Sequence, residues 1–251
     1  MDSFISWIGG KKLLRSRILK EFPAVGSFNR YIEVFGGAGW ILFASDRHAE
    51  MEVYNDINGN LVNLFKCAKY HPEALQKELE FILMSREQFF AAKEQMDIKS
   101  LTDIQRAARF YILIKESFAA DLHSFCIRPK NIAVAMEYIK KVSERLEMVV
   151  IENVDFERIL KTYDRKEALF YLDPPYYETE KYYPDRFKTE DHIRLKEALS
   201  PIKGKFILSY NDCCYVRELY KGYNIIEVER AHNLIQKAVK PRYKELIIKN
   251  Y

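Results

Sequence analysis

The sequence predicts an α/β fold in which a Rossmann-like sheet, built from both ends of the chain, carries a mostly helical insertion. Three observations support this prediction. A strand, a glycine-rich turn, a helix and a second strand follow one another near the start. Residues 59–146 have helical periodicity and few strand signals, and strand-like runs return after them. We therefore expect an α/β domain of residues 1–58 and 147–251 and a helical domain of residues 59–146.

The elements can be assigned in order from the apolar pattern. A helix is expected over residues 11–22, where Pro23 ends it. The next strands are expected at 31–34 and 52–54, with a helix that begins near Trp40 between them. After the helical region, strands are expected at 148–151, 169–172, 206–209, 225–228 and 245–248.

Composition narrows the class of protein. The chain has 251 residues, 48% of them apolar and 30% charged, which is typical of a globular protein. Its net charge of +4 permits nucleic-acid binding without establishing it. No apolar run could span a bilayer and no secretion signal is visible, so we expect a cytoplasmic protein with no membrane partner. The four cysteines and five histidines lack metal-site spacing, so we expect free thiols and no metal.

The turn Asp173-Pro174-Pro175-Tyr176 directly follows the apolar run 168–172, at the edge where open α/β sheets bind ligands. Neither proline can donate a backbone hydrogen bond, so the turn is rigid and its carbonyls face outward. A carboxylate and a fixed carbonyl can accept both hydrogens of an aromatic amine and direct its lone pair toward an electrophile. The Tyr176 ring can stack on a planar base, worth about 1–3 kcal/mol in comparable sites. Taken alone, the turn could also be an ordinary one with Asp173 as a helix cap.

Two further segments contain glycine. In Phe35-Gly36-Gly37-Ala38-Gly39, after the first strand, glycine permits positive φ and a close approach of the backbone to a ligand. Asp56 ends the next strand, where a carboxylate commonly bonds ribose hydroxyls. This pair would suit a dinucleotide enzyme as well, although Leu42 stands where that motif has its third glycine. The segment Trp7-Ile8-Gly9-Gly10-Lys11 is by itself equally a helix cap, and it is not a P-loop.

Taken in order, these segments resemble the Dam-type, D12 class (alpha-group) adenine-specific DNA methyltransferases. The resemblance lies in Trp-x-Gly-Gly-Lys, Phe-x-Gly-x-Gly, Asp-x-Asn, a long insert and Asp-Pro-Pro-Tyr. It extends to Ser209-Tyr210-Asn211-Asp212 and to Arg242-x-Lys244-Glu245-Leu246, and covers roughly residues 1–60 and 150–251. There are two departures. Trp40 replaces a residue that is usually small, and residues 116–125 are closer to phage-type enzymes, so recognition of GATC is not implied.

The resemblance implies methyl transfer from S-adenosylmethionine to adenine N6 in double-stranded DNA, with the target base flipped out of the duplex. Asp173 would face both cofactor and amine, Pro174 would supply the carbonyl, and Tyr176 would stack on the base. Pro175 completes the rigid turn. The residues that would hold the cofactor with Asp173 are Trp7, Gly10, Lys11, Phe35, Gly37, Gly39 and Asp56.

Basic segments are the candidates for contacts with DNA phosphates, although each lone lysine or arginine is more often a solvated surface charge. The DNA-contact candidates are Arg128, Lys130, Lys141 and Asn211, with Lys140 and Lys181 as further cations. His123 and His192 are expected to be structural. The alternatives are methylation of cytosine N4 or of adenine in RNA, a catalytically inactive DNA-binding homologue, and a nicotinamide enzyme. A cognate restriction endonuclease is a possible partner.

Overall fold

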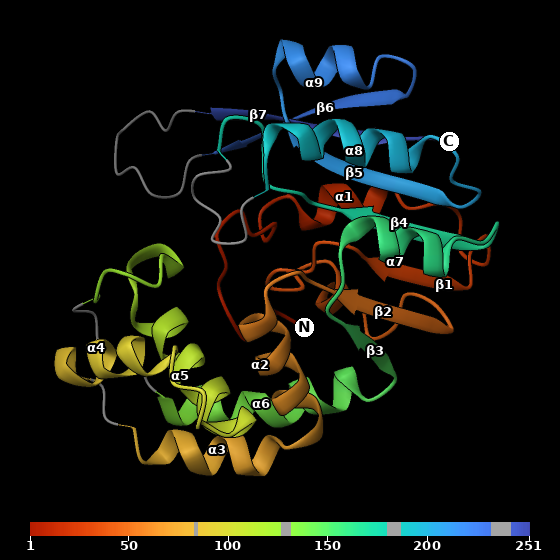
Figure 1. Cartoon of the computed structure of the whole chain (residues 1–251). Helices are drawn as coiled ribbons and strands as arrows, with labels where there is room; N and C mark the ends of the chain where they lie inside the picture. Colours follow the sequence, from red (N-terminus) through yellow and green to blue (C-terminus); the bar gives the residue numbers. More distant parts are fainter. Residues whose placement is uncertain (83–84, 127–131, 180–186, 232–241) are drawn as a thin grey trace.

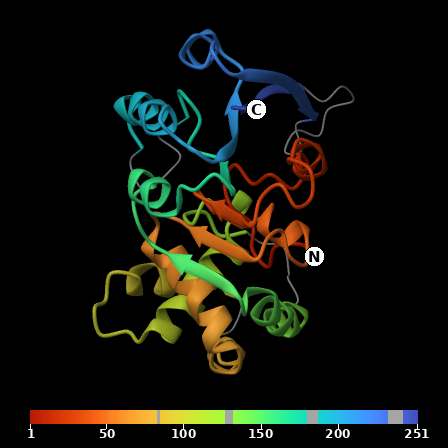
Figure 2. The same cartoon turned by 90° about the vertical axis from the view of Figure 1, so that its right-hand side faces the viewer.

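The computed structural model describes residues 1–82, 85–126, 132–179, 187–231 and 242–251. They contain a seven-stranded sheet with the strand order β3-β2-β1-β4-β5-β7-β6. Figure 2 shows the strands stacked from β3 at the bottom to the blue strands β6 and β7 at the top. The strands are β1 (Arg30–Glu33), β2 (Met51–Asn55), β3 (Val149–Glu152), β4 (Ala168–Leu172), β5 (Lys205–Asn211), β6 (Asn224–Ala231) and β7 (Arg242–Lys249).

Strands β1 to β5 are parallel, and β7 runs antiparallel between β5 and β6. The chain builds the sheet outward from β1 to β3 on one side and then from β4 to β5 on the other, so the order reverses between β1 and β4. Every strand expected from the sequence is present, within three residues at each end. The predicted Rossmann-like α/β fold is confirmed.

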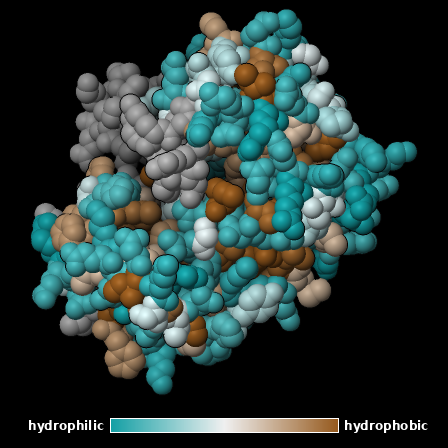
Figure 3. Space-filling view, viewed as in Figure 1, coloured by the Kyte–Doolittle hydropathy of each residue, from teal (hydrophilic) through white to brown (hydrophobic). Residues whose placement is uncertain are grey.

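The helices are α1 (Arg15–Lys20), α2 (Gly59–Tyr70), α3 (Pro72–Glu80), α4 (Arg86–Gln95), α5 (Asp103–Glu116), α6 (Ile132–Leu146), α7 (Phe156–Tyr163), α8 (Thr189–Leu199) and α9 (Cys214–Leu219). Two short 3-10 turns are η1 (Leu42–Ala44) and η2 (Phe118–Ala120). None of the helices in the described ranges has the length and apolar character that a membrane span needs. The face of the molecule seen in Figure 3 is mainly hydrophilic, with apolar side chains in smaller patches.

Alternate residues of the strands face two separate apolar cores, as the pleat of a sheet requires. On β1, Tyr31 belongs to one core and Ile32 to the other. The first core is shared with α1, α2, α5 and α6, and the second with α7, α8 and α9. The whole of β4 is buried, as expected for a central parallel strand covered on both faces. Because helices cover both faces, the ends of the strands are the place where a ligand can reach the sheet.

Helices α2 to α6 gather on one side of the molecule, at the lower left of Figure 1. Asn58 caps α2 by accepting a backbone N–H bond of 2.9 Å, and Thr102 and Gln105 form a capping box at the start of α5. Phe65 of α2 stacks on Tyr54 of β2, with ring centroids 4.1 Å apart. The helical segment therefore shares an apolar core with the sheet. Its role as a separate target-recognition domain remains a prediction.

The α-helix expected to begin near Trp40 was a wrong prediction, because the chain makes only the short turn η1 there. Carbonyl oxygens in this segment bond to side chains from elsewhere. His48 Nε2 lies 2.8 Å from the Ile41 carbonyl oxygen, and Arg145 donates to the carbonyls of Leu42 and Ser45, each at 2.8 Å. These contacts satisfy backbone groups that would otherwise need the bonds of a helix.

The first helix is also shorter than predicted, since α1 begins at Arg15 and not at Lys11. The Lys11 side chain is only 5% exposed and points inward. Residues 11–14 form a turn, closed by a 3.1 Å bond from the Leu14 N–H to the Lys11 carbonyl. The tertiary position of Lys11 thus overrides the local helical pattern.

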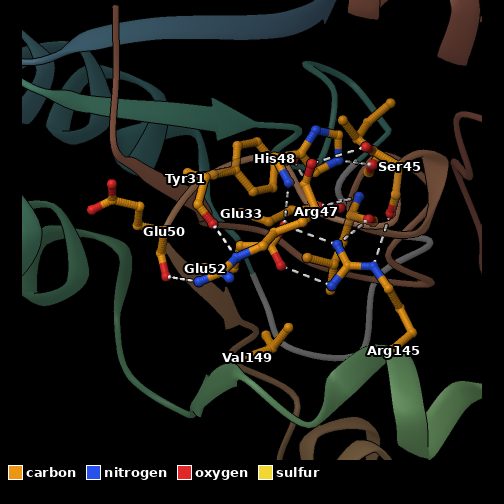
Figure 4. Close-up of polar contacts among 12 residues, drawn as sticks. Tyr31, Glu33, Ser45, Arg47, His48, Glu50, Glu52, Arg145 and Val149 are labelled. Carbon is orange, nitrogen blue, oxygen red and sulfur yellow. Dashed lines mark hydrogen bonds and ion pairs between the residues drawn. The ribbon is translucent and has the colours of Figure 1, made fainter. Parts of the chain in front are cut away.

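The Arg145 guanidinium, near the end of α6, is buried between the helical segment and the sheet (Figure 4). It makes two 2.8 Å bonds to the two carboxylate oxygens of Glu52 on β2, and the side chains are 6% and 3% exposed. Arg145 also bonds the Leu42 and Ser45 carbonyls. This one side chain therefore connects α6, β2 and the segment that follows the glycine turn of residues 35–39. Bidentate arginine–carboxylate pairs are among the strongest polar contacts in proteins.

Glu33, at the end of β1, is a buried carboxyl group in the same region (Figure 4). Its Oε2 accepts bonds from the Tyr31 hydroxyl at 2.9 Å and from the Leu42 backbone N–H at 2.7 Å. Burial, with a smaller contribution from the charge of Asp173, raises the pKa of Glu33 to about 8, although these two hydrogen bonds act to lower it. Glu33 is thus a neutral anchor for the glycine turn at neutral pH.

Replacing Arg145 with Met should lower the free energy of unfolding by about 3–5 kcal/mol, because Glu52 would remain buried without its cation. Urea denaturation measures this change. Arg106→Met is the control, since the Arg106–Asp103 pair is 36% and 73% exposed and should contribute less than about 1 kcal/mol. Equal effects of the two substitutions would contradict a structural role for the buried pair.

Glu33→Gln should change how stability depends on pH. Between the ordinary pKa of 4.5 and the raised value of about 8, the folded state holds a proton that the unfolded state has lost. This contribution to stability is complete below the lower value and is lost as pH rises through the upper one. The variant carries no such proton. The free energy of unfolding of the variant, relative to that of the wild type, should therefore increase as pH rises. Denaturant unfolding at several pH values tests this, and a constant difference would contradict it.

Candidate functional site

A pocket of about 140 Å³ lies at the carboxyl ends of β1, β2 and β4, beside the reversal of strand order. The glycine turn after β1 and the Asp173 turn after β4 form two of its walls. The N-terminal segment 7–11 forms a third wall, and residues 55–57 and 154–156 contribute from the ends of β2 and β3. Open parallel sheets bind ligands at this position.

Asp173 follows β4 directly, so the strand itself positions its carboxylate. Asp173 Oδ1 lies 2.7 Å from Lys11 Nζ, and the two side chains are 17% and 5% exposed. Lys11 Nζ also donates to the Gly9 carbonyl at 2.8 Å and lies 4.6 Å from the centroid of the Tyr176 ring. The structure thus brings Lys11 together with Asp173 and Tyr176, which are distant from it in the sequence. In this corner, one nitrogen donor faces a carboxylate and an aromatic ring.

Contacts with β5 and β7 hold the rest of the Asp173 turn, residues 174–176, in place. Pro174 is buried, and Pro175 lines the pocket. The Tyr176 hydroxyl donates to Glu245 Oε2 on β7 at 2.5 Å, and the Tyr176 ring packs at 6.0 Å from the Tyr210 ring. Burial, followed by the charge of Asp173, holds the pKa of Tyr176 well above its ordinary value. Tyr176 is therefore a neutral donor that ties the turn to β7.

Asn211, expected to be a DNA contact, holds the same turn. Its Oδ1 accepts the Tyr177 backbone N–H at 3.1 Å, and its Nδ2 donates to the Tyr177 carbonyl at 3.2 Å. The Tyr177 ring stacks on Tyr215 with centroids 4.2 Å apart. Both ends of the Asn211 amide are thus engaged with the chain itself, which gives this residue a structural task at the end of β5.

The glycine turn has the backbone geometry that the sequence predicted. Gly37 and Gly39 have φ of +50° and +68°, which favour glycine. A Cβ on Gly36 would lie 2.3 Å from the Tyr54 ring, so only glycine fits there. The Tyr54 hydroxyl donates to the Gly37 carbonyl at 2.7 Å. Tyr54 packs against one side of the glycine turn, and the turn also lines the pocket.

Asp56 lies at the end of β2 and lines the pocket, as expected. Its two carboxylate oxygens accept the backbone N–H groups of Gly37 and Asn58, each at 2.8 Å. These bonds fix the carboxylate at the edge of the pocket. Asn55, which the sequence analysis did not single out, bonds the carbonyls of Val34 and Val154 at 2.8 and 3.0 Å and joins the ends of three strands.

An aromatic wall of Phe35, Phe156 and Phe187 lines the other side of the pocket, with ring centroids 5.7–6.0 Å apart. The Arg194 guanidinium lies 4.3 Å from the Phe156 ring and 2.7 Å from Asp155. The sequence analysis predicted Phe35 but missed the other residues. A signal was present for Asp155 and Phe156, because they come soon after the strand predicted at 148–151, but not for Phe187 and Arg194.

Other candidates lie elsewhere. Arg128, Lys130 and Lys181 fall outside the described residues, and Lys140 and Lys141 are exposed on α6. His192 is fully buried, with Nδ1 2.5 Å from the Tyr210 hydroxyl, in line with a structural role. The four cysteines are free thiols. Within the described ranges, no three His, Cys, Asp or Glu residues gather as a metal-binding group.

Comparisons with known proteins show the family to which the chain belongs. A family model described as D12 class N6 adenine-specific DNA methyltransferase matches residues 7–234. The type II methyltransferase M1.LlaDCHI of Lactococcus lactis subsp. cremoris is 28% identical, over 99% of this chain and 95% of its own length. The type II methyltransferase M.MjaIII of Methanocaldococcus jannaschii is 30% identical, over 99% of this chain and 98% of its own. A DNA adenine methylase of Haemophilus influenzae is 24% identical, over 97% and 92%.

Among solved structures, an rRNA methylase from Streptococcus thermophilus aligns over 95% of this chain and 96% of its own at 8% identity, with a TM-score of 0.35. The family match, in contrast, includes the N-terminal Trp7–Lys11 segment, the glycine turn and the Asp173 turn. The resemblance seen in the sequence is therefore confirmed. The chain belongs to the D12 class N6 adenine-specific DNA methyltransferase family, whose members are site-specific DNA adenine methyltransferases.

Proposed function

We propose that the pocket binds S-adenosylmethionine and that the Asp173 turn holds the N6 amine of an adenine flipped out of duplex DNA. The contact between Lys11 Nζ and Asp173 Oδ1, at 2.7 Å, carries the proposal. It supports the view that this corner accepts a nitrogen donor beside an aromatic ring. An adenine N6 that donates to Asp173 while its ring stacks on Tyr176 would present this carboxylate with the same kind of donor, and a carboxylate can accept from more than one donor at once.

The residues of the pocket fit S-adenosylmethionine. The close-packed Gly10 and Gly36 leave no room for a Cβ, so backbone forms the walls there. Asp56 is placed to bond ribose hydroxyls, and the aromatic wall of Phe35, Phe156 and Phe187 suits a flat adenine ring. Lys11 contacts Asp173 and Trp7 lines the same pocket, and we infer that the methionine end is held there.

When bound, S-adenosylmethionine supplies a methyl group on a positively charged sulfur, which is an excellent leaving group. The chain's task is then to align the amine and to activate it. Asp173 and the Pro174 carbonyl would accept the two amine hydrogens and direct the nitrogen lone pair into the pocket. Asn211 and Glu245 keep the turn rigid through Tyr177 and Tyr176. A rigid acceptor pair loses little free energy to reorganisation when the amine arrives.

We infer that the helical segment 59–146 contacts the duplex and selects the target sequence. It borders the pocket, since Phe110 of α5 packs against Trp7 with ring centroids 5.9 Å apart. The exposed Lys140 and Lys141 on α6 are candidates for phosphate contacts. The names of the type II relatives favour a partner restriction endonuclease for this enzyme.

Asp173→Ala should lower methyl transfer to duplex DNA on the order of a thousandfold, because the amine loses its charged acceptor. Transfer of labelled methyl groups, with nucleoside analysis of the product, measures the rate and identifies the methylated base. Tyr176→Ala should weaken transfer less. Asp46→Ala, at an exposed carboxylate outside both the pocket and the helical segment, is the control. Near-normal turnover of the Asp173 variant would reject the assignment, and N4-methylcytosine as the product would reject adenine as the target.

Titration with S-adenosylhomocysteine should change the tryptophan fluorescence of the protein. The chain has only 2 tryptophans, and Trp7 and Trp40 both line the pocket. Calorimetry gives the affinity independently, and the variants Trp7→Phe and Trp40→Phe assign the signal to each ring. If calorimetry detects binding while the emission stays constant, the cofactor binds elsewhere.

A further inference from the structure

Trp7 and Trp40 belong to two segments that are distant in sequence, one before α1 and the other directly after the glycine turn. Each tryptophan packs on a glycine of the other segment. A Cβ on Gly10 would lie 2.8 Å from Trp40 Nε1, and a Cβ on Gly37 would lie 3.1 Å from Trp7 Cδ1. Side chains at either glycine would therefore displace the opposing tryptophan. The two segments interlock through this pair of contacts, which we call the Trp–Gly lock.

The Trp–Gly lock lies next to the residue that reaches Asp173. Residues 7–10 form a turn, closed by a 3.1 Å bond from the Gly10 N–H to the Trp7 carbonyl. Gly9 has a φ of +77°, and its carbonyl accepts the Lys11 ammonium at 2.8 Å. The Trp40 ring thus presses on the backbone immediately before Lys11. A shift of this turn would move the ammonium away from the carboxylate.

Two more contacts hold the same segments together. The Lys12 ammonium lies 5.1 Å from the centroid of the Trp40 ring, within the range of a cation–π contact. Ser3 Oγ donates to the Ala38 carbonyl at 2.5 Å. Trp7 is also held by Phe110 of α5, whereas Gly10 has no side chain of its own with which to hold the turn. The position of Gly10 therefore depends on the ring that covers it.

We propose that Trp40 is a positioning residue for methyl transfer. Its ring holds the turn of residues 7–10 in position, so that Lys11 reaches Asp173 and the wall of the pocket around the methyl donor is complete. The role in the reaction rests on the proposed function. Trp40 acts through Gly10 and Lys11 and needs no contact with the reacting atoms. The packing of Trp40 on this turn is a property of the protein alone and can be measured without any ligand.

The test is a double-mutant cycle of Gly10→Ala and Trp40→Ser, read as the affinity for S-adenosylmethionine by calorimetry and as the KM for the donor. In the wild-type background, Gly10→Ala should weaken donor affinity about tenfold, because its methyl group displaces the Trp40 ring. In the Trp40→Ser background, the same substitution should cost less than about twofold, because the ring is absent. Trp40→Phe should retain most of the affinity that Trp40→Ser loses. Gly222→Ala is the matched control, since nothing lies within 4 Å of its Cβ.

The proposal is overturned if Gly10→Ala costs the same in both backgrounds, or if Trp40→Ser leaves the KM for the donor unchanged. A simple loss of stability would lower all rates in proportion to the folded fraction and would not produce this coupling. If the wild type binds no S-adenosylmethionine, the proposed function fails. The cycle is then measured as free energies of unfolding. Coupling between Gly10 and Trp40 supports the packing of Trp40 on the turn, and additive effects reject it.

Discussion

The parallel pairing of β1 with β4 is the constraint on which the site depends. The register places Glu33 opposite Tyr171, and the Val34 N–H extends it with a 2.9 Å bond to the Tyr171 carbonyl. The glycine turn and the Asp173 turn therefore leave the sheet side by side, although the helical segment separates them in sequence. From this point the chain builds the sheet outward in two opposite directions, which leaves space between the loops for a ligand.

Buried charges connect the parts of the chain that meet around this edge. Removing a charge from water is costly, and a buried pair is tolerated where geometry and further hydrogen bonds compensate for the loss of hydration. Arg145 meets this condition with four hydrogen bonds, two to Glu52 and one each to the carbonyls of Leu42 and Ser45. Lys11 meets it with the Asp173 carboxylate and the Gly9 carbonyl. The first pair joins the helical segment to the sheet, and the second joins the N-terminal segment to the Asp173 turn.

The pocket combines rigid backbone with aromatic side chains. Glycines let the chain pack closely at Gly36 and Gly10, and tyrosine and tryptophan rings fill the space beneath and beside them. Glu245 and Asn211 hold the Asp173 turn in place, so that in the proposed function its acceptors would be positioned before a base arrives. Such preorganisation matters for an amine nucleophile, because the chain must orient a weak lone pair and does not have to generate a strong base.

The sequence by itself determined the α/β fold, the positions of the strands, the family, and the placement of Asp173, Gly37 and Asp56 at strand ends. It could do so because strand periodicity and the residue types needed at tight turns are local properties. The tertiary structure decided what depends on contacts between distant segments. Arg145 and His48 bond the carbonyls of residues 41–45 where a helix was expected, and burial of Lys11 beside Asp173 shortens α1. The packing of Trp40 on Gly10 could not be predicted from the sequence either, because no local pattern shows which distant ring will cover a glycine.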